Sequence, residues 1–346
     1  MDIVVLVDNS LEMTEEGILG VQYHLLTLFG DGIPLGSYPN EPRTTRIGIV
    51  AYNTDSEVIA DLNQIQSFKN LNDSLLNLKL SNSYDSYLSK GLKASEDLLY
   101  SEERRHYQKA IIIYSSVFNL ELDPVGVANR LKADGVNIIT VNFEEEEEED
   151  KELNWDLSQV ASPNFNFTAF HNENLIEDIR GALLQANCFC PNDWIQYRAS
   201  YPNESSLQFG TCLNFLPLKA SWTAARFACR HIHKNSYLAS EFSKEKHDFI
   251  HSFVQDSEEP SDSYHIGLNL VKGVWRWDQP PGWNQPELQE WKGWNQGFPM
   301  PSSSKTAVMN EKNGWQNIAP MGTVAGYICE TAACDSDNYC DEQDVN

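Results

Sequence analysis

A carboxylate and a hydroxyl follow the first apolar run of the chain and could together bind a cation. Residues 3–6 are apolar, and the next seven residues read V-D-N-S-L-E-M. In a doubly wound sheet, ligands bind beyond the carboxyl ends of the strands. Asp8 and Ser10 would offer the oxygen ligands that Mg²⁺ takes in proteins. The alternative is structural, because Asp8 can also cap the following helix or accept hydrogen bonds from turn amides beside Ser10.

The cysteines indicate a secreted protein. All seven lie after residue 187, and six of them could form three disulfides. No C-x-x-C pair with matching His or Cys spacing is present, which favours a disulfide framework over a zinc site. Sequons at Asn72, Asn166 and Asn203 allow glycosylation. We therefore expect an extracellular glycoprotein whose targeting segment has been removed or is missing from this sequence. The six cysteines are Cys190, Cys212, Cys229, Cys329, Cys334 and Cys340, and Cys188 is the seventh.

Motifs of catalytic chemistry are missing from the sequence. It contains no G-x-G-x-x-G, Walker loop, G-x-S-x-G or H-E-x-x-H. His231 and His233 lie near Cys229, but we expect that cysteine in a disulfide, which removes it as a zinc ligand. The sequence thus predicts a protein that is not an enzyme and needs no cofactor, Mg²⁺ and Ca²⁺ being the alternatives.

The net charge of the chain limits the kinds of partner that it can bind. The formal net charge is −25, whereas nucleic acids and anionic membrane surfaces attract Lys and Arg. No apolar stretch approaches the ~20 residues of a membrane helix. We therefore expect neither nucleic acid binding nor membrane insertion. Residues 144–150 are six Glu and one Asp; such a run could collect cations or basic partners but is more typical of a solvated loop.

Apolar runs alternate with amphipathic stretches over residues 1–187. The expected strands are residues 3–7, 46–52, 110–114 and 136–141, and the expected helices are 17–29, 87–100, 124–134 and 175–186. Continuous apolar runs bounded by turns indicate strands buried on both faces. The sequence therefore predicts an α/β domain, a doubly wound parallel sheet covered by helices, with Asp8 at the end of its first strand.

The composition changes after residue 188, where Trp, Pro, Gly and Asn become frequent. Two helices are expected at residues 221–229 and 243–254, and short strands at 265–270, 274–277, 306–310 and 324–330. We predict a disulfide-stapled α+β domain over residues 188–331. An acidic tail follows at residues 332–346, in which Cys334 and Cys340 would close a small loop.

The first domain resembles a von Willebrand factor A domain. Members carry D-x-S-x-S after the first strand, a Thr on a later loop and an Asp after the fourth strand; together these bind Mg²⁺ and leave one position for a partner's carboxylate. By this resemblance the site residues are Asp8, Ser10, Glu12, Ser86 and Ser115. Glu12 replaces the second Ser, Ser86 the Thr and Ser115 the Asp. The exchange of Asp for Ser loses a charge, and Glu12 could block the open position, so we predict the remnant of a metal site.

The second domain resembles a C-type lectin-like domain over about 140 residues. The stretches that carry the resemblance are C-P-N-D-W at 190–194, W-T-A-A-R-F-A-C at 222–229, S-Y-L-A-S at 236–240, H-I-G-L at 265–268, W-R-W at 275–277 and G-Y-I-C-E at 326–330. The resemblance implies the pairs Cys190–Cys212 and Cys229–Cys329. Cys188 has no obvious partner; it could be free, pair between chains, or bind an upstream cysteine absent from this sequence.

The residues that bind calcium in such domains are replaced here. Sugar-binding members carry E-P-N or Q-P-D on a long loop and W-N-D on a late strand, whereas this chain has G-F-P-M-P and W-Q-N. Apolar side chains cannot ligate Ca²⁺, which takes six to eight oxygens. We expect the long loop to act instead as a contact surface without calcium. Its candidate residues are Trp291, Trp294, Phe298, Met300, Gln316 and Asn317, with Trp283 nearby.

The pairing of the two domains resembles secreted lectin-like proteins of invertebrates, nematodes in particular. This resemblance implies extracellular recognition and a role in innate defence. The leading hypothesis is a secreted, non-catalytic recognition protein that binds a protein or glycan ligand through the lectin-like long loop. The alternative is a structural adhesion or extracellular-matrix protein that binds its partners through the A domain.

Overall fold

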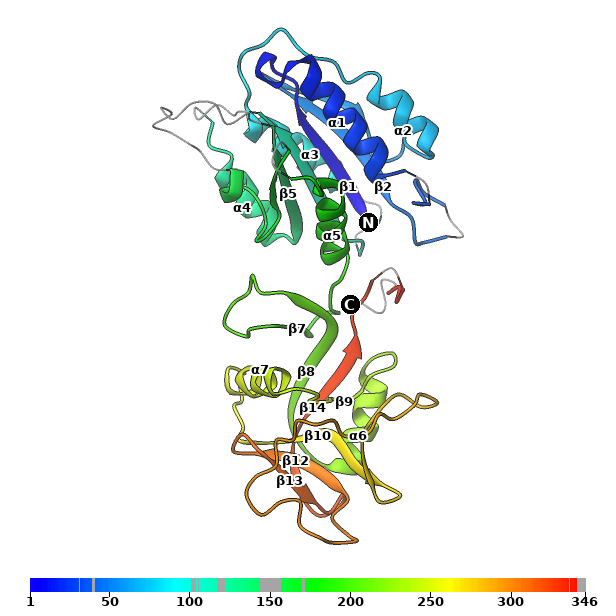
Figure 1. Ribbon diagram of the computed structural model, residues 1–346, viewed down its shortest axis with the longest axis vertical. Coiled ribbons are helices and arrows are strands. Elements are labelled where there is room, and N and C mark those ends of the chain that lie inside the picture. Colours follow the sequence, from blue (N-terminus) through cyan, green and yellow to red (C-terminus); the bar gives the residue numbers. More distant parts are fainter. Residues whose placement is uncertain are drawn as a thin grey trace. The chain divides into compact units, whose positions relative to one another are not determined.

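The chain forms two compact units, Met1–Asn187 and Cys188–Asn346 (Figure 1). The computed structural model describes residues 1–346 except 31, 39–40, 101–103, 105, 117–121, 144–156, 170–171, 336 and 341–346. The acidic run at residues 144–150 and the end of the expected acidic tail therefore lie outside the described residues.

In the described part of the first unit, a six-stranded sheet has the order β3-β2-β1-β4-β5-β6. All neighbouring strands run parallel except β3, which is antiparallel to β2. Every residue of β1 and β2 is buried, as the continuous apolar runs predicted. The bounds are β1 (Asp2–Asp8), β2 (Arg46–Tyr52), β3 (Ser56–Ala60), β4 (Lys109–Ser115), β5 (Val136–Asn142) and β6 (Asn166–Thr168).

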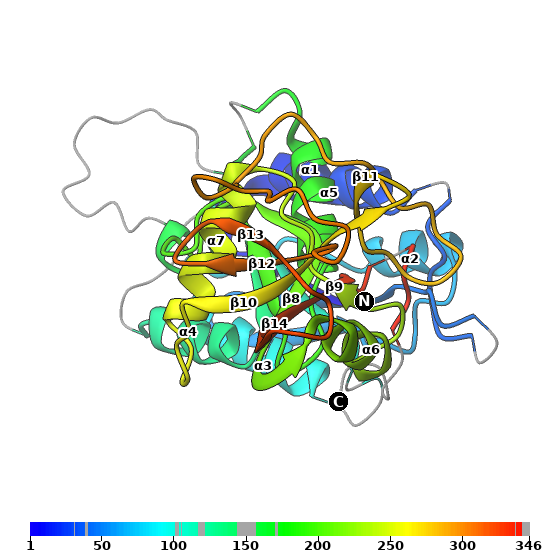
Figure 2. The ribbon, with the colours of Figure 1, turned by 90° about the horizontal axis from the view of Figure 1, so that it is seen from below.

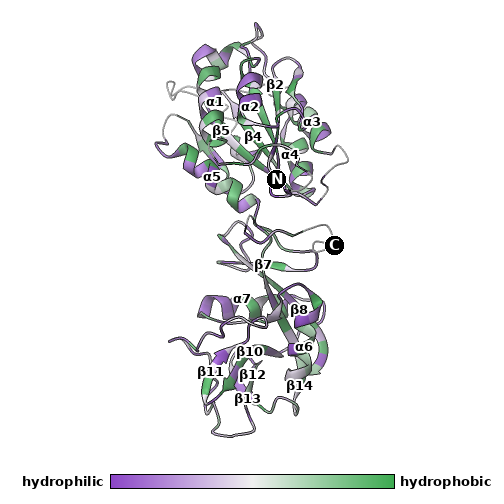
Figure 3. Ribbon diagram, turned by 90° about the vertical axis from the view of Figure 1, so that its right-hand side faces the viewer, coloured by the Kyte–Doolittle hydropathy of each residue, from purple (hydrophilic) through white to green (hydrophobic). Residues whose placement is uncertain are grey.

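Helices cover both faces of this sheet, so the predicted doubly wound α/β fold is confirmed. Val5 and Val7 of β1 pack with α1, α2 and α5, whereas Val4 and Leu6 pack with α3 and α4, because successive side chains of a strand alternate between its faces. Figure 3 shows the hydrophobic strands enclosed by helices with polar outer faces. The helices are α1 (Thr14–Leu28), α2 (Phe68–Leu75), α3 (Leu88–Leu99), α4 (Val125–Ala133) and α5 (Leu175–Ala186), with 3-10 turns η1 (Leu11–Met13) and η2 (Leu157–Gln159).

The second unit is the predicted α+β fold. Its strand order is β13-β12-β10-β14-β8-β7, with β11 paired to β10 and β9 to β14. Helix α7 packs on one face of this sheet and α6 on the other, and the two lie on either side of the strands in Figure 2. The bounds are β7 (Ile195–Arg198), β8 (Gln208–Ser221), α6 (Trp222–Ile232), β9 (Tyr237–Leu238), α7 (Lys244–Gln255), β10 (Ser263–Val271), β11 (Val274–Trp277), β12 (Ala307–Glu311), β13 (Trp315–Ile318) and β14 (Val324–Ala332).

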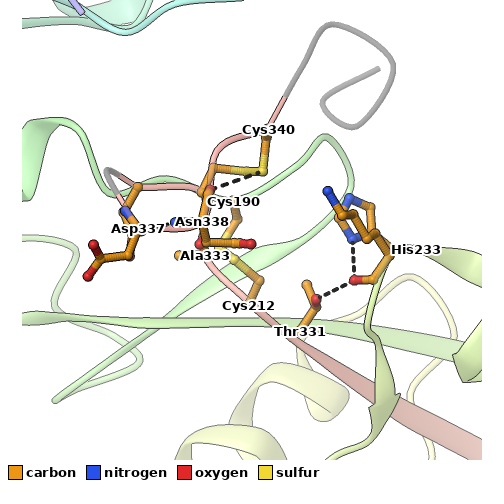
Figure 4. The surroundings of a disulfide bond; sticks show 11 residues. Cys190, Cys212, His233, Thr331, Ala333, Asp337, Asn338 and Cys340 are labelled. Carbon is orange, nitrogen blue, oxygen red and sulfur yellow. Dashed lines mark hydrogen bonds between the residues drawn. A yellow bond between two sulfur atoms is a disulfide. The ribbon is translucent and has the colours of Figure 1, made fainter. Parts of the chain in front are cut away.

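Three disulfides staple the second unit: Cys190–Cys212, Cys229–Cys329 and Cys334–Cys340. Figure 4 shows the first of them beside the small loop that the last one closes. The backbone of Phe189 pairs with that of Cys334 through two hydrogen bonds, so the start of this unit is tied to its end. Cys188 is half-buried and forms no disulfide within this chain; its thiol accepts a hydrogen bond from the Gln196 amide at 3.4 Å, and burial raises its pKa.

Candidate functional site

Asp8 lies where the topology of the first sheet would place a ligand. It ends β1 and stands opposite Tyr52 at the end of β2, while Val7 stands opposite Tyr114 of β4. The strands that follow β1 and β4 in sequence lie on opposite sides of this pair in the sheet. The loops therefore diverge at the carboxyl ends of β1 and β4, which is the topological switch point of a doubly wound sheet.

Hydrogen bonds within the protein satisfy the Asp8 carboxylate. Its Oδ1 accepts from the Ser10 N–H at 2.9 Å and its Oδ2 from the Ser116 hydroxyl at 3.1 Å. The Ser86 hydroxyl also bonds to it. The Ser115 hydroxyl accepts from the Tyr52 phenol at 2.9 Å. The structure thus gathers Asp8, Ser10, Ser86 and Ser115 as expected, and it adds a residue that the sequence reasoning missed, Ser116.

Glu12 differs from these residues in its surroundings. Asp8, Ser10, Ser86 and Ser115 are at most 1% exposed, whereas Glu12 is an exposed residue of η1. The carboxylate that the sequence offered as a replacement charge therefore lies in solvent. It does not share the buried environment of Asp8.

Burial decides the electrostatics of this cluster. It raises the pKa of Asp8 above its ordinary value, although the N–H and the hydroxyl of Ser10 and the hydroxyls of Ser116 and Ser86 lower it. The pKa of Tyr52 is also raised, first by burial and then by the charge on Asp8. An ionised Asp8 is thus costly here and is stabilised by neutral hydroxyls.

The Mg²⁺ ion implied by the resemblance does not fit this set of donors. Mg²⁺ requires a near-octahedral shell of oxygens. Among the described residues no three His, Cys, Asp or Glu side chains come together as a metal site, and the Asp8 oxygens already accept hydrogen bonds. Within the described part of the chain, the other oxygens of this cluster are neutral hydroxyls, of which that of Ser10 makes no hydrogen bond of ordinary geometry. One hydrogen-bonded carboxylate among neutral hydroxyls supplies a single negative charge for a doubly charged ion.

Asp8→Asn is expected to leave the first unit as stable or more stable at neutral pH. The raised pKa means that the folded state binds the Asp8 proton more tightly than the unfolded state. The stability that the Asp8 proton contributes is therefore fully present below the pKa of Asp8 in the unfolded chain. It is lost as pH rises through the pKa of Asp8 in the folded chain. Urea unfolding followed by hydrogen exchange of first-unit peptides, at acidic and at neutral pH, measures the difference. A rise in wild-type stability with Mg²⁺ that Asp8→Asn abolishes would contradict this assignment.

In the second unit, the long loop comprises residues 278–306, between β11 and β12. Asn317 of β13 holds this loop in place. Its Oδ1 accepts from the Met300 N–H at 2.7 Å, and its Nδ2 donates to the carbonyls of Met300 and Lys305 at 2.9 and 3.0 Å. The side chain is 2% exposed. Both the amide nitrogen and the side-chain oxygen of Asn317 thus bond to the backbone of the loop. The neighbouring Gln316 is partly exposed.

Trp291 and Trp294 support the loop from within. Both are partly buried and pack against the core that contains the fully buried Trp315, with ring centroids 5.0 and 5.7 Å from that of Trp315. Gly293 permits this close packing, because a Cβ there would lie 2.9 Å from Trp291 and 3.0 Å from Trp315. The two tryptophans expected on the contact surface are therefore mainly structural.

The exposed apolar side chains of this region are Trp283 and Met300, at 59% and 41%; Phe298 is partly exposed. Trp283 stands on a turn closed by its N–H and the Pro280 carbonyl, 3.1 Å apart. On either side of this turn in sequence, the backbone N–H of Trp277 donates to the Pro286 carbonyl at 2.9 Å, and the Arg276 guanidinium to the Gln285 carbonyl at 2.8 Å. A segment held by these hydrogen bonds therefore exposes the Trp283 indole to solvent. The position of Trp283 in the sequence alone could not distinguish it from the packed tryptophans nearby.

The three sequons lie on different kinds of element. Asn203 is exposed in the loop between β7 and β8, where its Oδ1 accepts from the Ser205 N–H at 3.1 Å. Asn166 is exposed on β6, and Asn72 is partly buried on α2. Exposure and an irregular backbone make Asn203 the most accessible of the three.

Comparison with known families agrees with both folds. The von Willebrand factor type A domain pattern matches residues 2–182, more than half of the chain, and the lectin C-type domain pattern matches residues 218–331. The chain belongs to the von Willebrand factor type A domain family and carries a C-type lectin domain after it.

The chain is similar to several known proteins. C-type lectin domain-containing protein 160 of Caenorhabditis elegans is 27% identical over 98% of this chain and 54% of its own length, so the chain spans about half of that relative. Rheacalcin-2 of Rhea americana is 29% identical over 26% of this chain and 66% of its own length. The solved structure of proximal thread matrix protein 1 from the mussel byssus, with a zinc-occupied MIDAS motif, gives a TM-score of 0.47 at 20% identity, covering 56% of this chain and 49% of that one.

Both domain families are usually non-enzymatic, and their combination supports a role in recognition or adhesion. The disulfides and the lectin homologues are consistent with an extracellular protein. Over the described residues, no helix has the length and apolar character needed to span a bilayer.

Proposed function

We propose that this chain is a secreted recognition protein that binds a glycan or protein ligand through the long loop of its lectin-like unit, without calcium. The A-like unit would comprise residues 1–187, the lectin-like domain 188–331 and the acidic tail 332–346. Binding by the exposed face of the loop, around Trp283 and Met300, is the central element of the proposal. A microbial glycan as ligand would connect it with innate defence.

The observation that carries the proposal is the hydrogen bonding of Asn317. Calcium that binds a sugar needs side-chain oxygens that are free to face the ion. The Asn317 oxygen instead accepts from the Met300 N–H, and apolar Phe298 and Met300 flank Pro299 in the loop. The late motif therefore supports a fixed loop, and the exposed Trp283 indole offers the flat apolar surface that stacks on sugar rings or anchors a protein partner.

Binding by the full chain to a printed panel of microbial and animal glycans and extracellular-matrix proteins tests this function. We expect equal binding in EDTA and in CaCl₂. The double variant Trp283→Ser with Met300→Ser should bind about thirtyfold more weakly, which corresponds to the ~2 kcal/mol of a hot-spot aromatic. Both side chains are exposed, so the fold should persist.

The matched control is Phe227→Ser on α6, which removes another exposed aromatic, 68% accessible, outside the long loop. It should bind as the wild type does. Binding that disappears in EDTA, or that survives the double loop variant, would overturn the proposal. Loss of binding with Tyr84→Ser, 76% exposed in the loop before α3, would assign recognition to the A-like unit and favour the adhesion alternative.

A further inference from the structure

A buried histidine and a buried glutamate lie beneath the long loop. His247 of α7 and Glu241, between β9 and α7, are 3% and 0% exposed. The His247 Nδ1 and the Glu241 Oε2 are 2.7 Å apart. The same oxygen accepts from the Trp315 indole N–H, and the Tyr264 hydroxyl approaches the other oxygen at 3.5 Å. Such a pair persists in a core only when its hydrogen bonds are made.

The imidazole of His247 faces two acceptors. Glu241 is one, and the backbone of Asn313 is the other, whose hydrogen bond to the ring contributes to the raised pKa of His247. Asn313 lies in the tight turn between β12 and β13, where it and Lys312 both have positive φ. Only the doubly protonated ring can donate to both acceptors at once. The second proton of the ring therefore links α7 to the turn that precedes β13, the strand that carries Trp315 and Asn317.

The long loop packs directly on this histidine. The Trp291 ring centroid lies 5.3 Å from that of His247 and 5.0 Å from that of Trp315. We propose that the His247–Glu241 pair is a protonation-dependent support for the long loop. When His247 carries both protons, the ring holds Glu241, the Asn313 turn and Trp291 together. When one proton leaves, one acceptor loses its donor and the segment around Trp291 loosens. This device rests on the proposed function, in which the same loop binds the ligand.

The groups around His247 set the direction of the response. Burial disfavours the imidazolium, but the charge of Glu241 and the hydrogen bonds to Glu241 and Asn313 outweigh it, and Asp248 adds to them, so the pKa of His247 is raised. His251, one turn further along α7, has a pKa lowered by burial and then by the charge on His247, against Asp262, Glu241 and Asp248. The support is thus complete below the ordinary pKa of 6.5 and is lost as pH rises through the raised value.

Indole N–H resonances of the ¹⁵N-labelled full chain, followed against pH, test the support without any ligand. In the wild type, the Trp291 and Trp315 signals should shift with one midpoint above pH 6.5, the same midpoint as the His247 Cε1–H signal. His247→Gln should abolish the shift. His251→Gln, on the same helix, should retain it with only a small change of midpoint.

Constant indole signals in the wild type while the His247 signal titrates would overturn the inference, and this reading does not depend on the variant folding. Persistence of the shift in His247→Gln would overturn it as well. Affinity for a glycan bound on the panel should fall as pH rises through the same midpoint. Indole signals that titrate while that affinity stays constant uphold the support and overturn the loop as the binding site.

Discussion

Replacement of Cys229 and Cys329 by alanine is expected to lower the free energy of unfolding of the lectin-like unit by roughly 4–5 kcal/mol. The disulfide joins α6 to β14 across 100 residues of sequence, and both cysteines are fully buried in the core on the α6 face. In the chain-entropy model, a cross-link restricts the unfolded chain more strongly as the loop it closes becomes longer. This disulfide therefore restricts the conformations that most of the lectin-like unit can adopt in the unfolded state.

The bridge between Cys334 and Cys340 is the matched control, because it closes only six residues. Its removal should cost about half as much in the same model. Guanidinium unfolding followed by tryptophan fluorescence isolates the effect, since eight of the nine tryptophans lie after residue 188. Equal losses for the two variants would show that loop length does not govern the stabilisation. A change in hydrogen exchange of first-unit peptides would show that the two units do not unfold independently.

In the first unit, the strands that the sequence predicted are those with a continuous apolar pattern. β1, β2, β4 and β5 are buried on both faces, so their apolar runs identify them. β3 escaped this reasoning because only one of its five residues is buried, and β6 because it has only three residues. β8 contains polar residues and Pro217 in its 14 residues, and only its pairing with β14 and β7 makes it a strand.

The sites could be located from the sequence, but their internal contacts could not. Asp8 followed from its place after the first apolar run. Whether Ser115 or Ser116 faces Asp8 depends on the side to which each residue points at the end of β4, and on the Tyr52 hydroxyl that comes across from β2. The partners of Asn317 are 17 and 12 residues away. Local patterns carry no information on such contacts, which tertiary packing sets.

The two positions at which these families hold cations share one physical feature here. In each, hydrogen bonds from the protein satisfy the groups that an ion would need: Ser10 and Ser116 at Asp8, and the Met300 N–H at Asn317. A buried polar group is costly unless it is hydrogen-bonded. Where the ligand charges are lost from the sequence, internal donors can therefore stabilise the remaining oxygens, as the proposed metal-free function requires.

Lys246→Met is expected to destabilise the lectin-like unit by about 3–5 kcal/mol. Lys246 precedes His247 on α7 and pairs with Glu330 of β14, with its Nζ 2.9 Å from Oε2. The two side chains are 7% and 5% exposed. The Glu330 carboxylate also accepts from the Ser240 N–H at 2.8 Å and from the Tyr237 hydroxyl at 2.9 Å. Methionine keeps the apolar stem of the lysine but removes its charge, which leaves a buried carboxylate without a cation.

The double variant Lys246→Met with Glu330→Gln separates charge from packing. The glutamine oxygen can still accept from the Ser240 N–H, and no uncompensated charge remains, so much of the lost stability should return. Tryptophan fluorescence during urea unfolding measures the free energy of unfolding of the wild type, of Lys246→Met and of the double variant. A double variant as unstable as Lys246→Met alone would attribute the loss to packing. Recovery would show that the loss comes from the uncompensated charge of Glu330, so that Lys246 fixes α7 to β14 by charge.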